Sequence, residues 1–375
     1  MPTVYSNLIQ SIRPLIHPKD FEAPLTQSID LYFPDFLNAA LDKYVAFYKK
    51  DLLQHIDLQV PFDPPQNDNV ISKIEKLSTA IIKTVELFYQ GKIFEATNTF
   101  NSSLEEVLFD EIKALATIPA TTNFYRARAS GDKQFTKSDL FHIKFELRHI
   151  VSTNRYSVPG FPSLYLGDST YLCWEEFNRY RLRDLSFSRL ANMRELKIIQ
   201  IQRIEDFLLE LNTVHQNLQL TFLLRFLVTF PLTIACSIKV KFPNGNFKPE
   251  YIIPQLLLQY VSRNDSIDGI KFLSTKVGYS KLDGVSAYNY VFPVKTVDKR
   301  GFCNKLADLF HLTDPTSLEL EEIMYNPITH PMSIGGGSSP DRRCIELVEG
   351  QKSYYATTSF GKLETNLIIR SLGKV

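Results

Sequence analysis

The segment from Asn154 to Glu176, NRYSVPGFPSLYLGDSTYLCWEE, most constrains what this chain can fold into. Its Pro-Gly-Phe-Pro sequence predicts a turn, and the apolar run Ser163–Gly167 that follows is typical of a buried strand. The Asp-Ser-Thr run at 168–170 is suited to capping a helix, which we expect to carry Glu175 and Glu176 toward its middle. The segment thus brings a cation, a phenol and a carboxylate into one unit of strand, turn and helix.

Residues 1–118 are predicted to form a helical N-terminal extension. Apolar side chains recur at helical spacing in Phe33–Leu53 and again from Val70 to about Gln90. A third helix is expected over Ser103–Ile118, opened by a capping box with Glu106. These helices show no cluster of residues suited to chemistry, so we expect them to pack on the main domain or to bind a partner.

Segments typical of strands and of helices are mixed in residues 119–296, which predicts an α+β core. The expected strands are Phe124–Arg128, Ser163–Gly167, Leu196–Ile201, Leu232–Val240, Gly269–Ser274 and Asn289–Pro293, and the expected helices include Thr221–Phe230 and Glu250–Val261. Ser138–Ile150 fits a helix or a strand. Residues 297–375 are expected to be a C-terminal extension in which Cys344–Val348 pairs with Ser353–Thr358 as a hairpin.

Composition limits the classes of partner. The chain has 375 residues, 44% of them hydrophobic, and its 42 basic and 41 acidic residues give a net charge of +1, so neither nucleic acid nor a membrane is an expected partner. The start of the sequence lacks a secretory signal pattern, so we expect a cytoplasmic protein. The apolar run Leu218–Ile238 contains Arg225 and Pro231, which favours a buried helix and strand over a membrane span. The cysteines are scattered, and no metal site is expected.

Five side chains form the candidate site: Arg126, Arg155, Tyr165, Glu176 and Ser274. Two guanidinium groups match the oxygens of a diphosphate, and a tyrosine can stack on a flat cationic ring. A carboxylate can stabilise the oxocarbenium-like state that forms when a glycosidic bond breaks. A diphosphate, a ribose and a cationic base together describe NAD+. No GxGxxG sequence follows a strand, so Rossmann-type binding is not expected. Each residue alone also has an ordinary structural explanation.

Four blocks carry a resemblance to a known family: FYRAR at Phe124–Arg128, the segment Arg155–Glu176, DGIKFLS at Asp268–Ser274 and NYVFP at Asn289–Pro293. Together they resemble the RES domain of the toxins in RES-Xre toxin-antitoxin pairs, over about half of the chain. The middle block is the most specific, with a tyrosine ten residues after Arg155 and a glutamate eleven residues further on. The resemblance implies a fold similar to ADP-ribosyltransferases and an enzyme that stops growth by hydrolysis or phosphorolysis of NAD+.

The resemblance also implies a role for each residue. Arg126 and Arg155 would bind the phosphates or ribose of NAD+, and Tyr165 would line the nicotinamide pocket. Glu176 would be the catalytic carboxylate, assisted by Arg155 and Tyr165, and Ser274 would help to hold the substrate. Glu175 would replace Glu176 if the helix were offset by one residue.

The same resemblance implies the partners. NAD+ would be a substrate rather than a permanently bound cofactor, inorganic phosphate a candidate acceptor, and an antitoxin or regulatory protein a candidate partner. Two alternative hypotheses are an ADP-ribosyltransferase that modifies a macromolecule and a binding or regulatory protein without catalysis.

Overall fold

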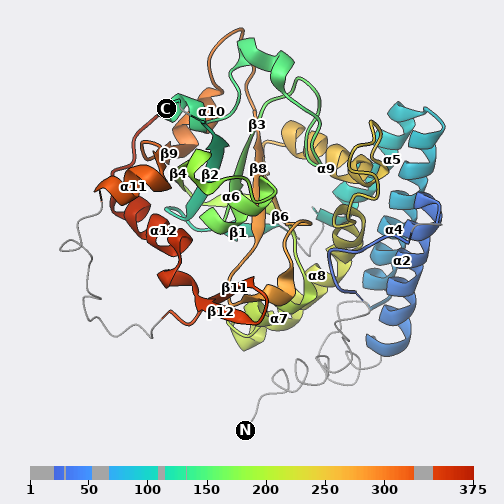
Figure 1. The fold of residues 1–375 in the computed structure, drawn as a ribbon. Coiled ribbons are helices and arrows are strands. Elements are labelled where there is room, and N and C mark those ends of the chain that lie inside the picture. Colours follow the sequence, from blue (N-terminus) through green and yellow to red (C-terminus); the bar gives the residue numbers. More distant parts are fainter. Residues whose placement is uncertain (1–20, 29–30, 53–66, 109–114, 132, 325–340) are drawn as a thin grey trace. The chain divides into compact units, whose positions relative to one another are not determined.

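The computed structural model describes residues 21–28, 31–52, 67–108, 115–131, 133–324 and 341–375 (Figure 1). The fold is α+β with helices toward the N-terminus, as predicted. The chain divides into two compact units that interleave along the sequence. Unit 1 contains Met1–Ala116, Thr153–Val158 and Ile198–Thr275, and unit 2 contains Thr117–Ser152, Pro159–Lys197 and Lys276–Val375. The units therefore group the chain differently from the segments 1–118, 119–296 and 297–375, which stay a sequence-based prediction of domain boundaries.

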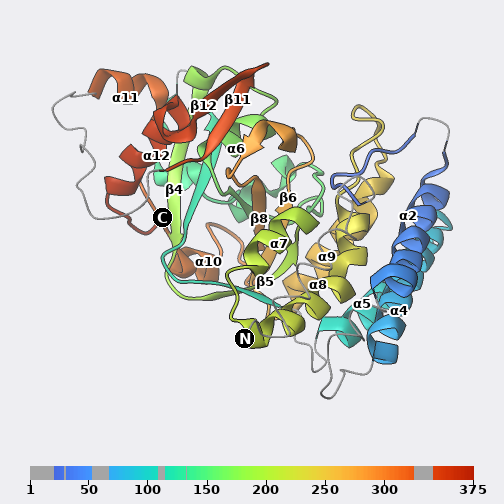
Figure 2. The ribbon, with the colours of Figure 1, turned by 90° about the horizontal axis from the view of Figure 1, so that it is seen from below.

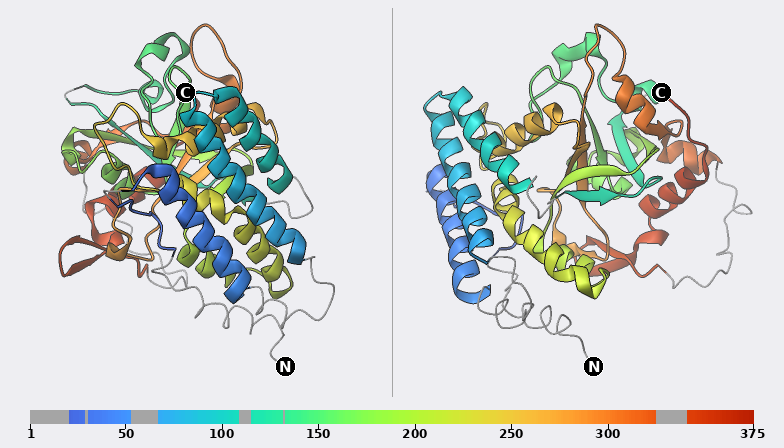
Figure 3. Two further views of the ribbon diagram at one scale, coloured as in Figure 1. Left: turned by 90° about the vertical axis from the view of Figure 1, so that its right-hand side faces the viewer. Right: turned by 180° about the vertical axis from the view of Figure 1, so that it is seen from behind.

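Helices dominate the first part of unit 1. Helices α2 (Phe33–Phe47), α4 (Asn67–Tyr89) and α5 (Ile93–Leu108) lie side by side in sequence order, and a π-helical turn, Tyr48–Leu52, extends α2 (Figure 3). The first two predicted helices are confirmed. The buried side chains of α4 recur at helical spacing because one face packs on its neighbours: Val70, Ile74, Leu77, Ile81 and Val85.

A parallel strand pair belongs to the second part of unit 1, which includes its first strand from Ile198 onward. Strands β5 (Leu196–Ile201) and β6 (Gly269–Leu273) pair with Ile198 opposite Gly269. A parallel pair needs a long crossover, and here it contains α7 (Ile204–Leu211), α8 (Gln216–Cys236) and α9 (Ile252–Arg263). Pro254 is the third residue of α9, in the first turn as expected, where its missing N–H has no intrahelical acceptor.

Unit 2 is organised on an antiparallel sheet. Its strand order is β8 (Tyr288–Pro293), β3 (Ser163–Gly167), β2 (Asn123–Ala129) and β4 (Leu185–Asn192), and both β9 (Phe310–Leu312) and β10 (Thr316–Ser317) pair with β4. Aromatic rings pack edge to face on this sheet, with 4.9 Å between the centroids of Phe124 and Tyr290 and 5.9 Å between Phe124 and Phe310. The predicted strands β2, β3 and β8 are confirmed.

The C-terminal part of the described chain completes unit 2. Helix α12 (Ser359–Ile369) packs against β4 and against α6 (Thr170–Glu176) (Figure 2). The predicted hairpin is confirmed, with β11 (Cys344–Val348) paired to β12 (Gln351–Tyr354), although the second strand begins before Ser353. The remaining elements are β1 (Ala116–Ile118), β7 (Leu282–Asp283), α10 (Asn304–Leu309), α11 (Leu318–Met324) and the 3-10 turns Lys137–Leu140, Phe145–Ile150, Leu182–Asp184, Pro249–Tyr251, Tyr279–Lys281 and Tyr355–Thr357.

The third predicted helix is misplaced. Helix α5 begins at Ile93, so Ser103 is an interior residue and the capping box with Glu106 is wrong. Gly91, with φ at +75°, ends the preceding helix in the left-handed conformation that glycine adopts most readily, and the next helix starts two residues later at Ile93. The end of the predicted helix falls partly on residues 109–114, outside the described residues, and partly on β1.

Two further expectations are corrected. Leu232–Cys236 continues α8 instead of opening a strand, because an apolar run buried on all sides has no periodicity that separates a helix from a strand. Glu176 is the last residue of α6 rather than a middle one. Among the described helices, α8 included, none has the length and apolarity to cross a membrane.

Candidate functional site

Glu176 lies at the C-terminal end of α6 in unit 2. The amide of Asn289 in β8 donates a hydrogen bond to Glu176 Oε1 at 2.6 Å. Lys276 Nζ lies 3.6 Å from Glu176 Oε2 and also donates to the main-chain carbonyl of Glu176. The carboxylate side chain is 31% exposed. Glu176 is therefore oriented by two nitrogen donors and still accessible to a ligand.

The neighbouring Glu175 has a different environment. Its side chain is 5% exposed, and its two oxygens accept from Arg179, Oε2 from Nε at 3.1 Å and Oε1 from Nη2 at 3.0 Å. A bidentate pair of this kind uses both carboxylate oxygens. Of the two adjacent glutamates, Glu176 is therefore the more accessible one, and its catalytic role stays a prediction.

Two contacts fix the N-terminal end of α6. The Ser169 hydroxyl accepts a hydrogen bond from the Leu172 N–H at 3.1 Å, as the sequence predicted for this capping position. Glu364 in α12 accepts from the Thr170 N–H at 2.7 Å, from the Thr170 hydroxyl at 3.0 Å and from the Tyr355 hydroxyl. Burial raises the pKa of Glu364 above its usual value, against the opposing effect of these hydrogen bonds. The helix that ends in Glu176 is thus anchored by the C-terminal part of unit 2.

Arg126 and Tyr165 lie on neighbouring strands of unit 2. Arg126 Nη1 donates to the main-chain oxygen of Tyr165 at 2.7 Å, while Arg126 Nε is buried without a hydrogen-bond partner. Within the described residues no carboxylate pairs with this guanidinium. Burial, helped by the charge of Arg128, lowers the pKa of Arg126 to about 10, so the side chain stays cationic at neutral pH. A half-buried cation that no described carboxylate neutralises is suited to an anionic ligand.

Arg155 and Ser274 belong to unit 1. Arg155 Nη1 donates to the Cys236 carbonyl at 3.2 Å, and Nη2 donates to the Ile238 carbonyl at 2.7 Å and to the Thr275 hydroxyl at 3.4 Å. Ser274 is 1% exposed and follows β6 directly. Arg155 therefore ties its own segment to the end of α8 and to the residue next to Ser274.

The five predicted residues thus divide between the two units. Unit 2 brings Arg126 into contact with Tyr165 and carries Glu176, whereas unit 1 carries Arg155 and Ser274.

Sequence reasoning missed the two residues that bind Glu176. Asn289 opens the NYVFP block, so its position was noticed but its role was not, and Lys276 carried no signal beyond its charge.

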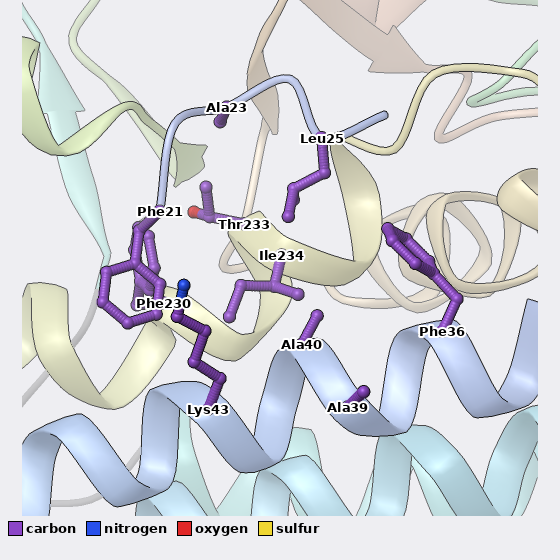
Figure 4. A pocket seen from close by; sticks show the side chains of 10 residues that line it. All are labelled: Phe21, Ala23, Leu25, Phe36, Ala39, Ala40, Lys43, Phe230, Thr233 and Ile234. Atoms are coloured by element: carbon purple, nitrogen blue, oxygen red, sulfur yellow. The ribbon is translucent and has the colours of Figure 1, made fainter. Parts of the chain in front are cut away.

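No metal-binding group emerges from the described side chains, since nowhere do three or more His, Cys, Asp or Glu residues gather to hold an ion. A cavity of about 260 Å³ lies in unit 1, between α2, α8 and the segment that precedes α2 (Figure 4). None of the five predicted site residues lines this cavity.

These features define an α+β protein in which two nitrogen donors orient an accessible carboxylate and a half-buried arginine has no carboxylate partner among the described residues. Over 322 residues the chain is 33% identical to a protein of Bacillus subtilis (strain 168) that is named "Putative toxin YopC", and the match covers 80% of this chain and 69% of that protein. The chain belongs to the family of that protein. No protein-family model matches the chain. No solved structure is significantly similar to it. The resemblance to the RES domain and to ADP-ribosyltransferases therefore stays a prediction.

Proposed function

We propose that this protein is a toxin-like, growth-inhibiting enzyme that cleaves the nicotinamide–ribose bond of NAD+, as a glycohydrolase or as a phosphorylase. Membership in the family of a protein named a putative toxin supports the toxin-like role. The observation that carries the chemistry is the Glu176 carboxylate, 31% exposed and held by Asn289 and Lys276 in the unit that also contains Arg126.

The proposed reaction begins when the bond between the ribose C1′ atom and the nicotinamide nitrogen breaks. The bonding electrons go to the nicotinamide ring, which leaves neutral, and positive charge develops on C1′ and the ribose ring oxygen. The Glu176 carboxylate stabilises that charge. A water molecule, which loses a proton, or an oxygen of inorganic phosphate then forms the new bond to C1′.

The other residues act on binding. The positive charge of Arg126, which no described carboxylate neutralises, suits the diphosphate, and the Tyr165 ring would stack on nicotinamide. Arg155 and Ser274 are assigned to substrate binding on the resemblance alone. An antitoxin or regulatory protein would be the partner that restrains the activity in a cell.

The test is release of nicotinamide from NAD+ by the purified protein, with and without inorganic phosphate. Glu176→Gln should lower turnover by about a thousandfold or more, because it removes a charge used in the transition state and keeps the size of the side chain. Glu175→Gln is the matched control and should keep most of the turnover. Dependence on phosphate identifies phosphorolysis.

Three outcomes would refute the proposal. Undiminished release by Glu176→Gln would exclude Glu176 as the catalytic carboxylate. Transfer of labelled ADP-ribose to a protein or nucleic acid in cell extract, without release of free product, would identify an ADP-ribosyltransferase. Normal growth of cells that overproduce the wild-type chain would argue for a binding protein without catalysis.

A further inference from the structure

The cavity in unit 1 exists because α2 presents small side chains to α8. Phe36, Ala39, Ala40 and Lys43 recur at the spacing of one helix face, and all four line the cavity (Figure 4). Ala39 and Ala40 lie between the two larger side chains. Two methyl groups cannot fill the space that leucines would fill at the same positions, so an opening remains between the helices.

The walls of the cavity are fixed by hydrogen bonds. The Tyr44 hydroxyl in α2 donates to the Leu227 carbonyl in α8 at 2.6 Å, which sets the approach of the two helices. The third wall is the segment before α2 that contains Leu25. Main-chain hydrogen bonds hold it, from the Leu25 N–H to the Ser237 carbonyl at 3.1 Å and from the Lys239 N–H to the Leu25 carbonyl at 2.8 Å. The cavity is therefore formed before any ligand binds.

The lining is apolar except at one end. Lys43 and Thr233 direct their nitrogen and oxygen toward the end that Phe21 and Phe230 enclose, whereas Leu25 lies at the other end (Figure 4). Lys43 Nζ is 5.6 Å from the centroid of the Phe21 ring, which places the ammonium against the aromatic wall. A cation and a hydroxyl donor next to an apolar chamber are complementary to a carboxylate on a hydrocarbon chain.

We propose that this cavity binds a small amphipathic carboxylate, with its carboxylate at Lys43 and Thr233 and its hydrocarbon chain toward Leu25. An apolar cavity of about 150 Å³ accommodates the six carbons of benzene, so the volume of about 260 Å³ has room for a chain of about eight to ten carbons. This ligand site is independent of the proposed cleavage of NAD+.

The experiment is titration calorimetry of the full chain with sodium octanoate, with octanol and octylamine as uncharged and cationic probes of the same length. We expect saturable binding of octanoate, and binding about tenfold weaker or more in Lys43→Met, which keeps the apolar part of the side chain and removes the charge. Lys50→Met is the matched control, because Lys50 follows α2 and does not line the cavity. Ala40→Leu, which adds side-chain volume at a helical position, should abolish binding.

Circular dichroism of each variant establishes that the helices are retained, since leucine and methionine are both good helix formers. The inference is overturned if octanoate fails to saturate the wild-type chain. It is also overturned if octanol or octylamine binds as tightly as octanoate, or if Lys43→Met leaves the affinity unchanged. Persistence of binding in Ala40→Leu would show that octanoate binds elsewhere on the chain.

Discussion

Two arginines, one in each unit, are held in opposite ways. Arg155 in unit 1 gives hydrogen bonds to two main-chain carbonyls and a hydroxyl. Arg126 in unit 2 has a buried Nε without an acceptor, and burial lowers its pKa. A guanidinium whose donors are used by the protein stabilises the fold, whereas one whose charge no described carboxylate neutralises retains the capacity to bind an anion. We therefore predict that Arg155 acts mainly on stability and that Arg126 acts mainly on ligand binding.

Of the effects that this comparison predicts, the largest is on activity in unit 2. Arg126→Gln should lower kcat/KM for NAD+ by about a hundredfold to a thousandfold, because a charge-assisted phosphate contact is lost. The Tm should stay the same or rise, since the change removes a half-buried charge that no carboxylate pairs with among the described residues. Steady-state kinetics and calorimetry measure the two effects. A fall in Tm without a change in kcat/KM would mean that Arg126 acts on stability and not on ligand binding.

The second effect is on the stability of unit 1. Arg155→Gln should lower the free energy of unfolding by about 2–4 kcal/mol, because the Cys236 and Ile238 carbonyls lose charged donors. Urea denaturation of the variant beside the wild type provides the measurement. Unchanged stability, together with a loss of NAD+ cleavage, would mean that Arg155 acts in the same way as Arg126.

A smaller effect on activity is expected from the residues that orient Glu176. Asn289→Ala and Lys276→Met should each lower kcat for NAD+ cleavage by about tenfold, because the carboxylate loses a nitrogen donor and part of its orientation. Lys281→Met, which removes a half-buried charge in the same unit, is the control. If the two variants matched this control, orientation of Glu176 would depend on other contacts.

The smallest effect concerns pH and the anchor of α6. Because the pKa of Glu364 is raised by burial in the folded state, its contribution to stability is fully present below the unfolded pKa of about 4.3 and is lost as pH rises through the folded value. Glu364→Gln keeps a neutral side chain of the same size and removes this dependence. Urea midpoints at several pH values from 4 to 8 should show the variant gaining on the wild type as pH rises. If the urea midpoints of the variant and the wild type changed with pH in parallel, a raised pKa of Glu364 in the folded state would be contradicted.

The local pattern of apolar and polar residues in the sequence was sufficient to predict many of the strands and helices. The alternation in FYRAR, the apolar run SLYLG and the capping serine before α6 identified their elements, because strands and caps depend on neighbours in the sequence. The pattern failed where burial is uniform, as in Leu232–Cys236 of α8. It also failed where a glycine turn, rather than a cap, sets the start of a helix, as at Ile93.

The surroundings of the candidate site were less accessible to sequence reasoning. Glu176 was chosen over Glu175 by spacing, and the ion pair of Glu175 with Arg179 gives a physical reason for the same choice. Asn289 is 113 positions from Glu176 and Lys276 is 100 positions away, and no local pattern reports contacts at that separation. Side-chain partners of this kind depend on how strands are paired, which the sequence leaves open.

The anchor of α6 has a consequence for the order in which the protein becomes active. Thr170 and Glu364 are separated by 194 positions, so a ribosome must translate nearly two hundred further codons before the helix that ends in Glu176 receives its second contact. Throughout that interval the growing chain carries Glu176 on a helix that lacks this anchor. If the protein consumes NAD+, the delay postpones full activity until α12 has been made, and a partner that restrains the enzyme would have that time to reach it.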